Sequence, residues 1–198
     1  MVEDRLGRGL TLTEAGALVG CYCWIERRLF ALTGSWVQEM EDPATQIHLD
    51  EVSFQHAWHA ELWAQRLPSL DGIDPESFVQ EAETVLGPLL EGLGAGEDPG
   101  FIEVRRMSGL YRFLLPRLIA GYQHHLEAAR VSSDAPLIRV LRLVLSDELE
   151  SWQAGEALVQ SLIKGSEGAA EAAAVVQLLE GGLSELRAGI GLVPWPGP

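Results

Sequence analysis

The fold is decided by residues 48–66, whose sequence is HLDEVSFQHAWHAELWAQR. Successive residues of an α-helix are about 100° apart, which places four of these residues on one stripe. They are Val52, His56, His59 and Trp63. The two imidazoles therefore point the same way as the apolar side chains. Because a buried titratable group without a partner is strongly destabilising, the rest of the chain should supply partners for both histidines.

The composition predicts one domain, residues 1–198, with a sizeable core. Hydrophobic residues make up 47% of the chain and charged residues only 22%. The formal net charge of −15 produces a field that repels phosphate backbones and anionic membrane surfaces. We therefore expect neither nucleic acid nor a membrane as a partner. A small-molecule ligand and a second copy of the chain, forming a homodimer, are the partners we consider.

The two cysteines indicate a reducing compartment. Cys21 and Cys23 are two residues apart on a predicted helix, so their side chains diverge by about 200° and cannot bridge each other. The sequence also lacks an N-terminal basic-then-apolar signal and an uninterrupted apolar run of about 18 residues. Free thiols fit a soluble, cytoplasmic protein.

Two helix starts frame the histidine segment. Thr11 and Glu14 form the capping-box pattern Thr-x-x-Glu, which predicts a helix over residues 11–33. Asp42 followed by Pro43 supplies an N-cap and a residue suited to the first helical turn. This second helix carries His56 and His59 and ends before Pro68.

The rest of the chain also has helical periodicity. Asp74 and Pro75 predict a third helical pattern that reaches Leu89 and is interrupted or kinked at Gly87-Pro88, and residues 92–100 predict a loop. Later helices are expected at about 101–130, at about 135–163 after Asp134, and more weakly at about 169–180. Pro116 should kink the first of these or divide it. No stretch alternates strictly enough to predict a strand.

Two glutamates lie on apolar stripes. Glu26 follows Tyr22 by one turn on the first helix, and Glu148 lies between Leu145 and Trp152 on the helix over 135–163. A carboxylate at such a position needs a buried partner. By the same periodicity, three other acidic residues fall on the outside or the flank and are expected at the surface: Glu61, Asp147 and Glu150.

The helices show an internal repeat. When His59 is aligned with Glu148, His56 meets Leu145 and Trp63 meets Trp152. When Tyr22 is aligned with Tyr122, Glu26 meets Leu126 in the same way. Two repeated hairpins joined by a long connection predict an all-α four-helix bundle with a crossover helix and a short C-terminal helix.

This layout resembles the ferritin-like superfamily, in which one helix of each pair contributes an inward Glu and the other an inward Glu-x-x-His. Glu26 matches the first Glu, while His56 and His59 stand at the Glu and His of the first motif. In the second pair, the three corresponding positions hold other residues: Leu126, Leu145 and Glu148. The resemblance covers about 13–163, leaving a C-terminal helix and tail at about 168–198.

The resemblance implies that four residues converge in the bundle core: Glu26, His56, His59 and Glu148. Two imidazoles and two carboxylates suit a mononuclear iron, manganese or zinc ion. We expect the histidines and Glu26 to ligate the ion and Glu148 to act as a fourth ligand or a proton carrier. Tyr22 and Tyr122 lie one turn away and are expected to hydrogen-bond to the ligands, so Glu148, Tyr22 and Tyr122 form the candidate catalytic set.

Two functions follow from these residues. The first is a metal-dependent oxidoreductase or oxygenase that acts on a small molecule. The second is a metal-free bundle, in which the acids and imidazoles neutralise one another, that binds a ligand or a protein. In this case a homodimer would form through the Trp and Leu surface of the C-terminal helix and the VPWPGP tail. Iron storage is not expected, because a storage cage needs a complete ferroxidase centre. An enzyme needs a cavity beside His56 and His59, whereas a structural network needs tight packing there.

Overall fold

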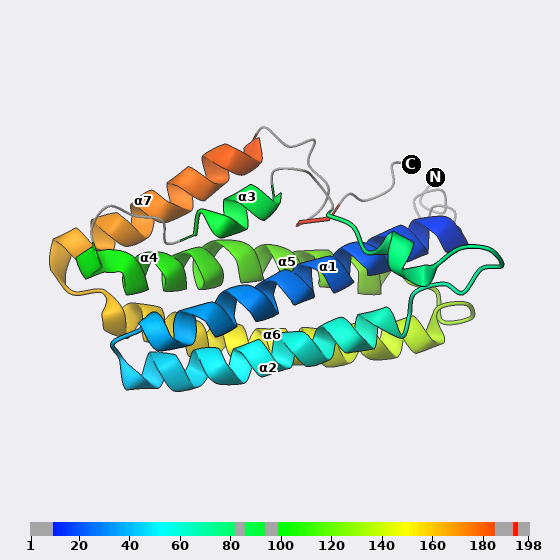
Figure 1. Ribbon diagram of the computed structural model, residues 1–198, viewed down its shortest axis with the longest axis horizontal. Helices are drawn as coiled ribbons and strands as arrows, with labels where there is room; N and C mark the ends of the chain where they lie inside the picture. Colours follow the sequence, from blue (N-terminus) through cyan, green and yellow to red (C-terminus); the bar gives the residue numbers. More distant parts are fainter. Residues whose placement is uncertain (1–9, 82–85, 94–98, 185–191, 194–198) are drawn as a thin grey trace, which may run out of the picture.

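The computed structural model is all-α, as the sequence predicts. It describes residues 10–81, 86–93, 99–184 and 192–193. Four long helical segments lie side by side (Figure 1). They are α1 (Leu12–Trp36), α2 (Pro43–Ala64), the continuous segment that ends in α5 (Leu115–Ala128), and α6 (Ala135–Leu162). An isolated antiparallel bridge joins Leu70 and Ile73.

The two predicted helix starts are confirmed in detail. The Thr11 hydroxyl oxygen accepts a hydrogen bond from the Glu14 backbone N–H at 3.2 Å, and the Glu14 carboxylate accepts one from the Thr11 N–H at 2.8 Å. At the start of α2, the Asp42 carboxylate accepts from the Thr45 N–H at 2.8 Å, and Pro43 occupies the first helical position. These bonds satisfy backbone donors that the first helical turn leaves unpaired.

Pro116 does not end its helix, because a π-helical turn precedes it. The segment runs from α4 (Ile102–Gly109) through a π-turn (Leu110–Leu114) into α5 without a break. Proline has no N–H to offer to the preceding turn. The Tyr111 carbonyl in that turn instead accepts a hydrogen bond from the Trp152 indole on α6 at 2.8 Å. The wider turn and this bond let the helix pass the proline.

The prediction of one continuous third helix is wrong. Asp74 caps only a 3₁₀ turn, Pro75–Phe78, and helix α3 is short (Leu86–Glu91); residues 82–85, part of the predicted pattern, lie outside the described residues. The reason is close backbone packing on α1: a Cβ added to Gly20 would lie 1.8 Å from the Phe78 carbonyl oxygen. The chain is extended at Val79, so the apolar periodicity of this region does not form a long helix.

The helix directions require a long crossover. Helices α1 and α2 form an antiparallel hairpin, and α5 and α6 form another (Figure 1). Because α2 and α5 run in the same direction, the connection between them crosses the length of the bundle. Helix α7 (Gly165–Ser184) is longer than predicted and packs on α4. Most of the predicted VPWPGP tail, residues 194–198, lies outside the described residues.

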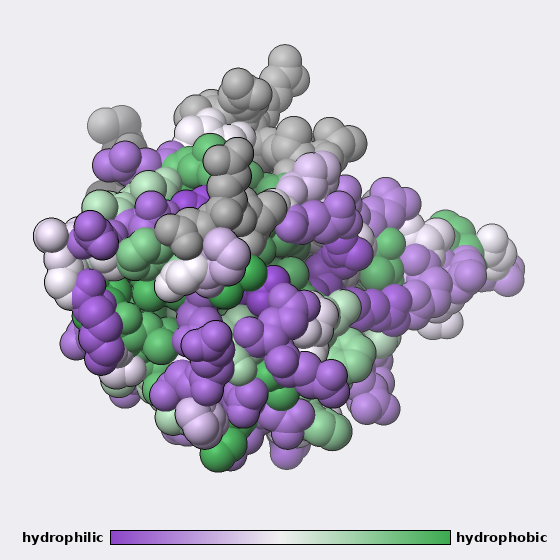
Figure 2. Space-filling view, turned by 60° about the vertical axis from the view of Figure 1, so that its left-hand side comes forward, coloured by the Kyte–Doolittle hydropathy of each residue, from purple (hydrophilic) through white to green (hydrophobic). Residues whose placement is uncertain are grey.

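Figure 2 shows a face on which polar side chains are interspersed with smaller apolar patches. Cys21 and Cys23 are both buried and unbridged, as predicted. Among the described residues, no helix has the length and apolar character needed to cross a membrane.

A substitution at Gly155 tests the packing of the π-turn. A Cβ at this position would lie 2.2 Å from the ring of Tyr111, which is fully buried. We expect Gly155→Ala to lower the free energy of unfolding by about 1–3 kcal/mol, measured by urea denaturation. Gly181→Ala on α7 is the control, because a Cβ there meets nothing within 4 Å. Equal stability of the two variants would contradict the packing of Tyr111 against α6.

Candidate metal centre

Four ionisable side chains from three helices meet inside the bundle. Glu26 comes from α1, His56 and His59 from α2, and Glu148 from α6. Each has 0% exposed surface. Each offers one potential ligand atom, and these atoms all lie within 4.8 Å of one another. Within the described residues, this is the one group of three or more His, Cys, Asp or Glu side chains that is close enough to hold a metal ion.

Each carboxylate faces the Nδ1 atoms of both histidines. Glu26 Oε2 lies 2.6 Å from His56 Nδ1, and Glu148 Oε1 lies 3.1 Å from His59 Nδ1. The cross contacts are longer, at 3.4 Å between His56 Nδ1 and Glu148 Oε1 and 3.7 Å between His59 Nδ1 and Glu26 Oε1. The two Nδ1 atoms and the carboxylate oxygens therefore surround a common point.

Hydrogen bonds between the helices fix the register that brings these residues together. The bonds join Ser53 Oγ to the Phe30 carbonyl at 3.1 Å, Cys23 Sγ to the Ala60 carbonyl at 3.4 Å, and Ser151 Oγ to Gln55 Oε1 at 2.5 Å. The first two join α1 to α2, and the third joins α2 to α6. All three lie within about one helical turn of a cluster residue.

The cluster is stabilised by opposite charges. Burial alone would lower the pKa of His56, but the adjacent Glu148 and Glu26 carboxylates outweigh it and raise the pKa. The same balance raises the pKa of His59, where Glu26 and Glu148 again oppose burial. Burial alone would raise the pKa of Glu26, but His56 and His59 lower it. Without a metal, protons on the imidazoles thus balance the carboxylate charge.

Two buried atoms of the cluster lack a partner. Among the described residues, neither His56 Nε2 nor Glu148 Oε2 has a hydrogen-bond partner. Such atoms are uncommon in native structures and call for an explanation such as an ion or a water molecule. A set of imidazole nitrogens and carboxylate oxygens with a free carboxylate oxygen is chemically suited to a divalent iron, manganese or zinc ion.

The two tyrosines named from the sequence differ in their contacts. Tyr122 on α5 donates a hydrogen bond from its hydroxyl to Glu26 Oε1 at 2.5 Å. The Tyr22 hydroxyl instead lies 3.1 Å from Nδ1 of His125. Burial lowers the pKa of His125 to about 4, so this imidazole is neutral at pH 7 and its Nδ1 can accept a hydrogen bond from the Tyr22 hydroxyl. The Tyr22 ring packs against the Tyr122 ring, at 4.8 Å between ring centroids.

Asp147, predicted on the outside or the flank of its helix, contacts the cluster. Its side chain is only 24% exposed, and Oδ2 lies 3.1 Å from His59 Nε2. Asp147 is adjacent to Glu148 and therefore about 100° off the buried stripe, so helical phase alone places it on the flank. The α2–α6 packing brings it onto the far edge of the His59 ring. His48 on α2 is half-buried and bonds to the Tyr111 hydroxyl at 2.7 Å.

The other positions of the internal repeat carry no ligand. Leu126 and Leu145 are half-buried and pack against the core. A surface pocket of about 390 Å³ lies at the start of α6, lined by Val131, Ala135, Ile138, Arg139 and Arg142. None of these residues belongs to the cluster, so this pocket is not the cavity that an enzyme would need beside His56 and His59.

The ion pairs predict a large effect of Glu26 on stability. Glu26→Gln removes the charge that balances the buried His56, and we expect the free energy of unfolding of the metal-free protein to fall by about 3–5 kcal/mol. Urea denaturation in the presence of a chelator measures this change. Glu61→Gln on the exposed face of α2 is the control, with an expected change within about 0.5 kcal/mol. A loss below about 1 kcal/mol for Glu26→Gln would contradict the charge balance described above.

Comparison with known proteins assigns no family to the chain. No family model matches it, and neither a curated protein nor a solved structure is significantly similar to it. The observations on function are therefore those of the chain itself: an all-helical fold with a buried cluster of two histidines and two glutamates that could hold a metal ion.

Proposed function

We propose that this chain is a ferritin-like bundle that binds one divalent transition-metal ion through Glu26, His56, His59 and Glu148. The observation that carries the proposal is the convergence of four fully buried donor side chains within 4.8 Å. Two paired hairpins and a connection that crosses the bundle support the ferritin-like topology. Glu148 Oε2 has no hydrogen-bond partner among the described residues, which leaves one carboxylate oxygen of the cluster available to such an ion.

Charge supports one ion and argues against two. Two carboxylates carry a charge of −2, which one divalent ion neutralises when both imidazoles are neutral. A second divalent ion would leave an uncompensated charge of +2 in a fully buried site, which is strongly unfavourable. Leu126 and Leu145 supply no further ligands. In the metal-free protein, two imidazole protons take the place of the ion.

The proposed activity is that of a non-haem oxidoreductase acting on a small molecule. A redox-active ion such as iron, or manganese, would supply one-electron chemistry toward oxygen, whereas zinc would not. Tyr122 would hold the Glu26 carboxylate in place through its hydroxyl. Glu148 has a free carboxylate oxygen and is the group best placed to carry a proton. The Tyr22 hydroxyl is paired with His125 and not with a residue of the cluster, so we assign Tyr22 a packing role against Tyr122.

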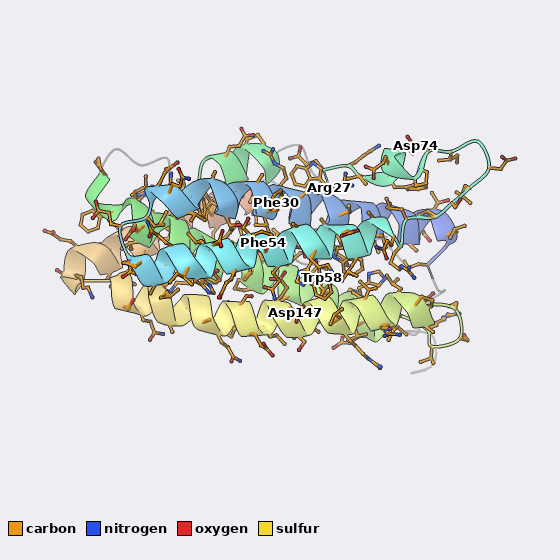
Figure 3. The ribbon with its side chains drawn as sticks, turned by 60° about the horizontal axis from the view of Figure 1, so that its bottom comes forward. Arg27, Phe30, Phe54, Trp58, Asp74 and Asp147 are labelled. Atoms are coloured by element: carbon orange, nitrogen blue, oxygen red, sulfur yellow. The ribbon has the colours of Figure 1, made fainter. Side chains whose placement is uncertain are left out.

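A metal-free binding module is the second candidate function. Three large apolar side chains, Phe30, Phe54 and Trp58, are 47%, 74% and 46% exposed on α1 and α2, where Figure 3 shows them along one side of the bundle. The cluster beneath is already balanced in charge without a metal. In this alternative the histidines and glutamates are structural, and the apolar surface binds a ligand, another protein or a second copy of the chain.

Metal content tests the proposal. The protein is loaded anaerobically with Fe(II), desalted and analysed by mass spectrometry. We expect about one metal per chain in the wild type and less than about a tenth of that in His56→Ala and His59→Ala, because each variant loses a ligand. His48→Ala is the matched control on α2, because His48 bonds to Tyr111 and not to the cluster. Absence of retained metal in the wild type would favour the metal-free module.

Metal affinity should depend steeply on pH. Glu26 and Glu148 raise the pKa of His56 to about 9, so its imidazole is protonated at neutral pH and must lose this proton to bind a metal. We expect the apparent Zn(II) association constant to rise by roughly ten- to a hundredfold per pH unit between about pH 6.5 and 8, as one or two protons are released. Competition with a chelator of known pH behaviour measures this slope. An affinity independent of pH would show that the imidazoles are already neutral.

A further inference from the structure

We infer that Asp147 is a positioning residue for the metal centre, which fixes the orientation and the tautomer of His59. The inference deepens the proposed function and rests on it. Its basis is the contact between Asp147 Oδ2 and His59 Nε2 at 3.1 Å, on the ring edge opposite to the cluster. Figure 3 shows Asp147 on α6, on the side that faces α2.

The hydrogen bond between Asp147 and His59 determines which nitrogen of the imidazole carries the proton. An ionised carboxylate can only accept hydrogen bonds, so the contact with Asp147 requires a proton on His59 Nε2. When the imidazole is neutral, its other nitrogen carries a lone pair and no proton. That nitrogen is Nδ1, which lies 3.1 Å from Glu148 Oε1 inside the cluster. Asp147 therefore directs the lone pair of His59 toward the proposed metal.

Helix α6 holds the His59 ring at both edges. Asp147 and Glu148 are consecutive residues whose carboxylates contact Nε2 and Nδ1, both at 3.1 Å. The Trp58 ring lies beside the same imidazole, with 5.9 Å between ring centroids. With a partner on each nitrogen, the ring cannot rotate without breaking a hydrogen bond. Metal ligands gain basicity and fixed geometry from such an outer carboxylate.

His56 provides an internal contrast. Its Nδ1 also faces the cluster, but its Nε2 has no partner among the described residues. Among the described residues, no side chain holds a proton on His56 Nε2 in the way that Asp147 holds one on His59 Nε2. The two histidines are therefore unequal ligands, and removal of Asp147 should make His59 resemble His56.

The test compares three variants loaded with Zn(II). Asp147→Leu removes the acceptor, Asp147→Asn keeps an oxygen that can accept from Nε2–H, and Glu150→Gln changes an exposed acid on the same helix. We expect Zn(II) affinity to fall by about 10–100-fold in Asp147→Leu, to fall less in Asp147→Asn, and to be unchanged in Glu150→Gln. Circular dichroism verifies that each variant remains helical.

Imidazole ¹⁵N NMR distinguishes positioning from a general structural effect. In the Zn(II)-loaded wild type, His59 should show a protonated Nε2 and a metal-bound Nδ1, and Asp147→Leu should lose this pattern while Asp147→Asn retains it. Unchanged affinity and an unchanged His59 pattern in Asp147→Leu would overturn the inference and leave the proposed metal site intact. Failure of the wild type to bind Zn(II) or Fe(II) would instead remove the proposed function, and this inference with it.

Discussion

Mutual compensation of buried charge is the constraint on which this structure depends. Glu26, His56, His59 and Glu148 have no exposed surface, and each has an oppositely charged partner within 4 Å. Removal of one partner leaves a charge in a medium of low dielectric constant, which costs far more than an ordinary hydrogen bond. The cluster therefore specifies how the helices pack, because a shift of one residue along α2 would turn both imidazoles away from their partners.

All four long helical segments contribute to this constraint. Helix α1 supplies Glu26, α2 supplies the histidines, α6 supplies Glu148, and α5 supplies the Tyr122 hydroxyl that bonds to Glu26. The π-turn before α5 allows this segment to stay helical past Pro116, because the Tyr111 carbonyl in that turn accepts a hydrogen bond from the Trp152 indole. A divalent ion would convert the same network from one balanced by protons into one balanced by metal.

The cluster could be predicted from the sequence because glutamates and histidines interrupt apolar helical stripes that are otherwise regular. Helical periodicity assigned Glu26 and Glu148 to the interior, and the cap residues Thr11 and Asp42 located two helix starts. Periodicity failed where long-range packing decides the outcome. It placed Asp147 on the flank, since the phase of one helix does not reveal how closely α2 approaches α6. Close packing of Phe78 on Gly20 likewise replaced a predicted long helix with a 3₁₀ turn.

The central claim is that the four buried side chains hold a single metal ion. Anomalous X-ray diffraction from crystals of the protein loaded with Zn(II) tests it most directly, with data collected on both sides of the zinc absorption edge. The account predicts one anomalous peak per chain, about 2.0–2.2 Å from nitrogen or oxygen atoms of Glu26, His56, His59 and Glu148. Peaks only at surface residues, or an interior without a peak in fully loaded crystals, would contradict it.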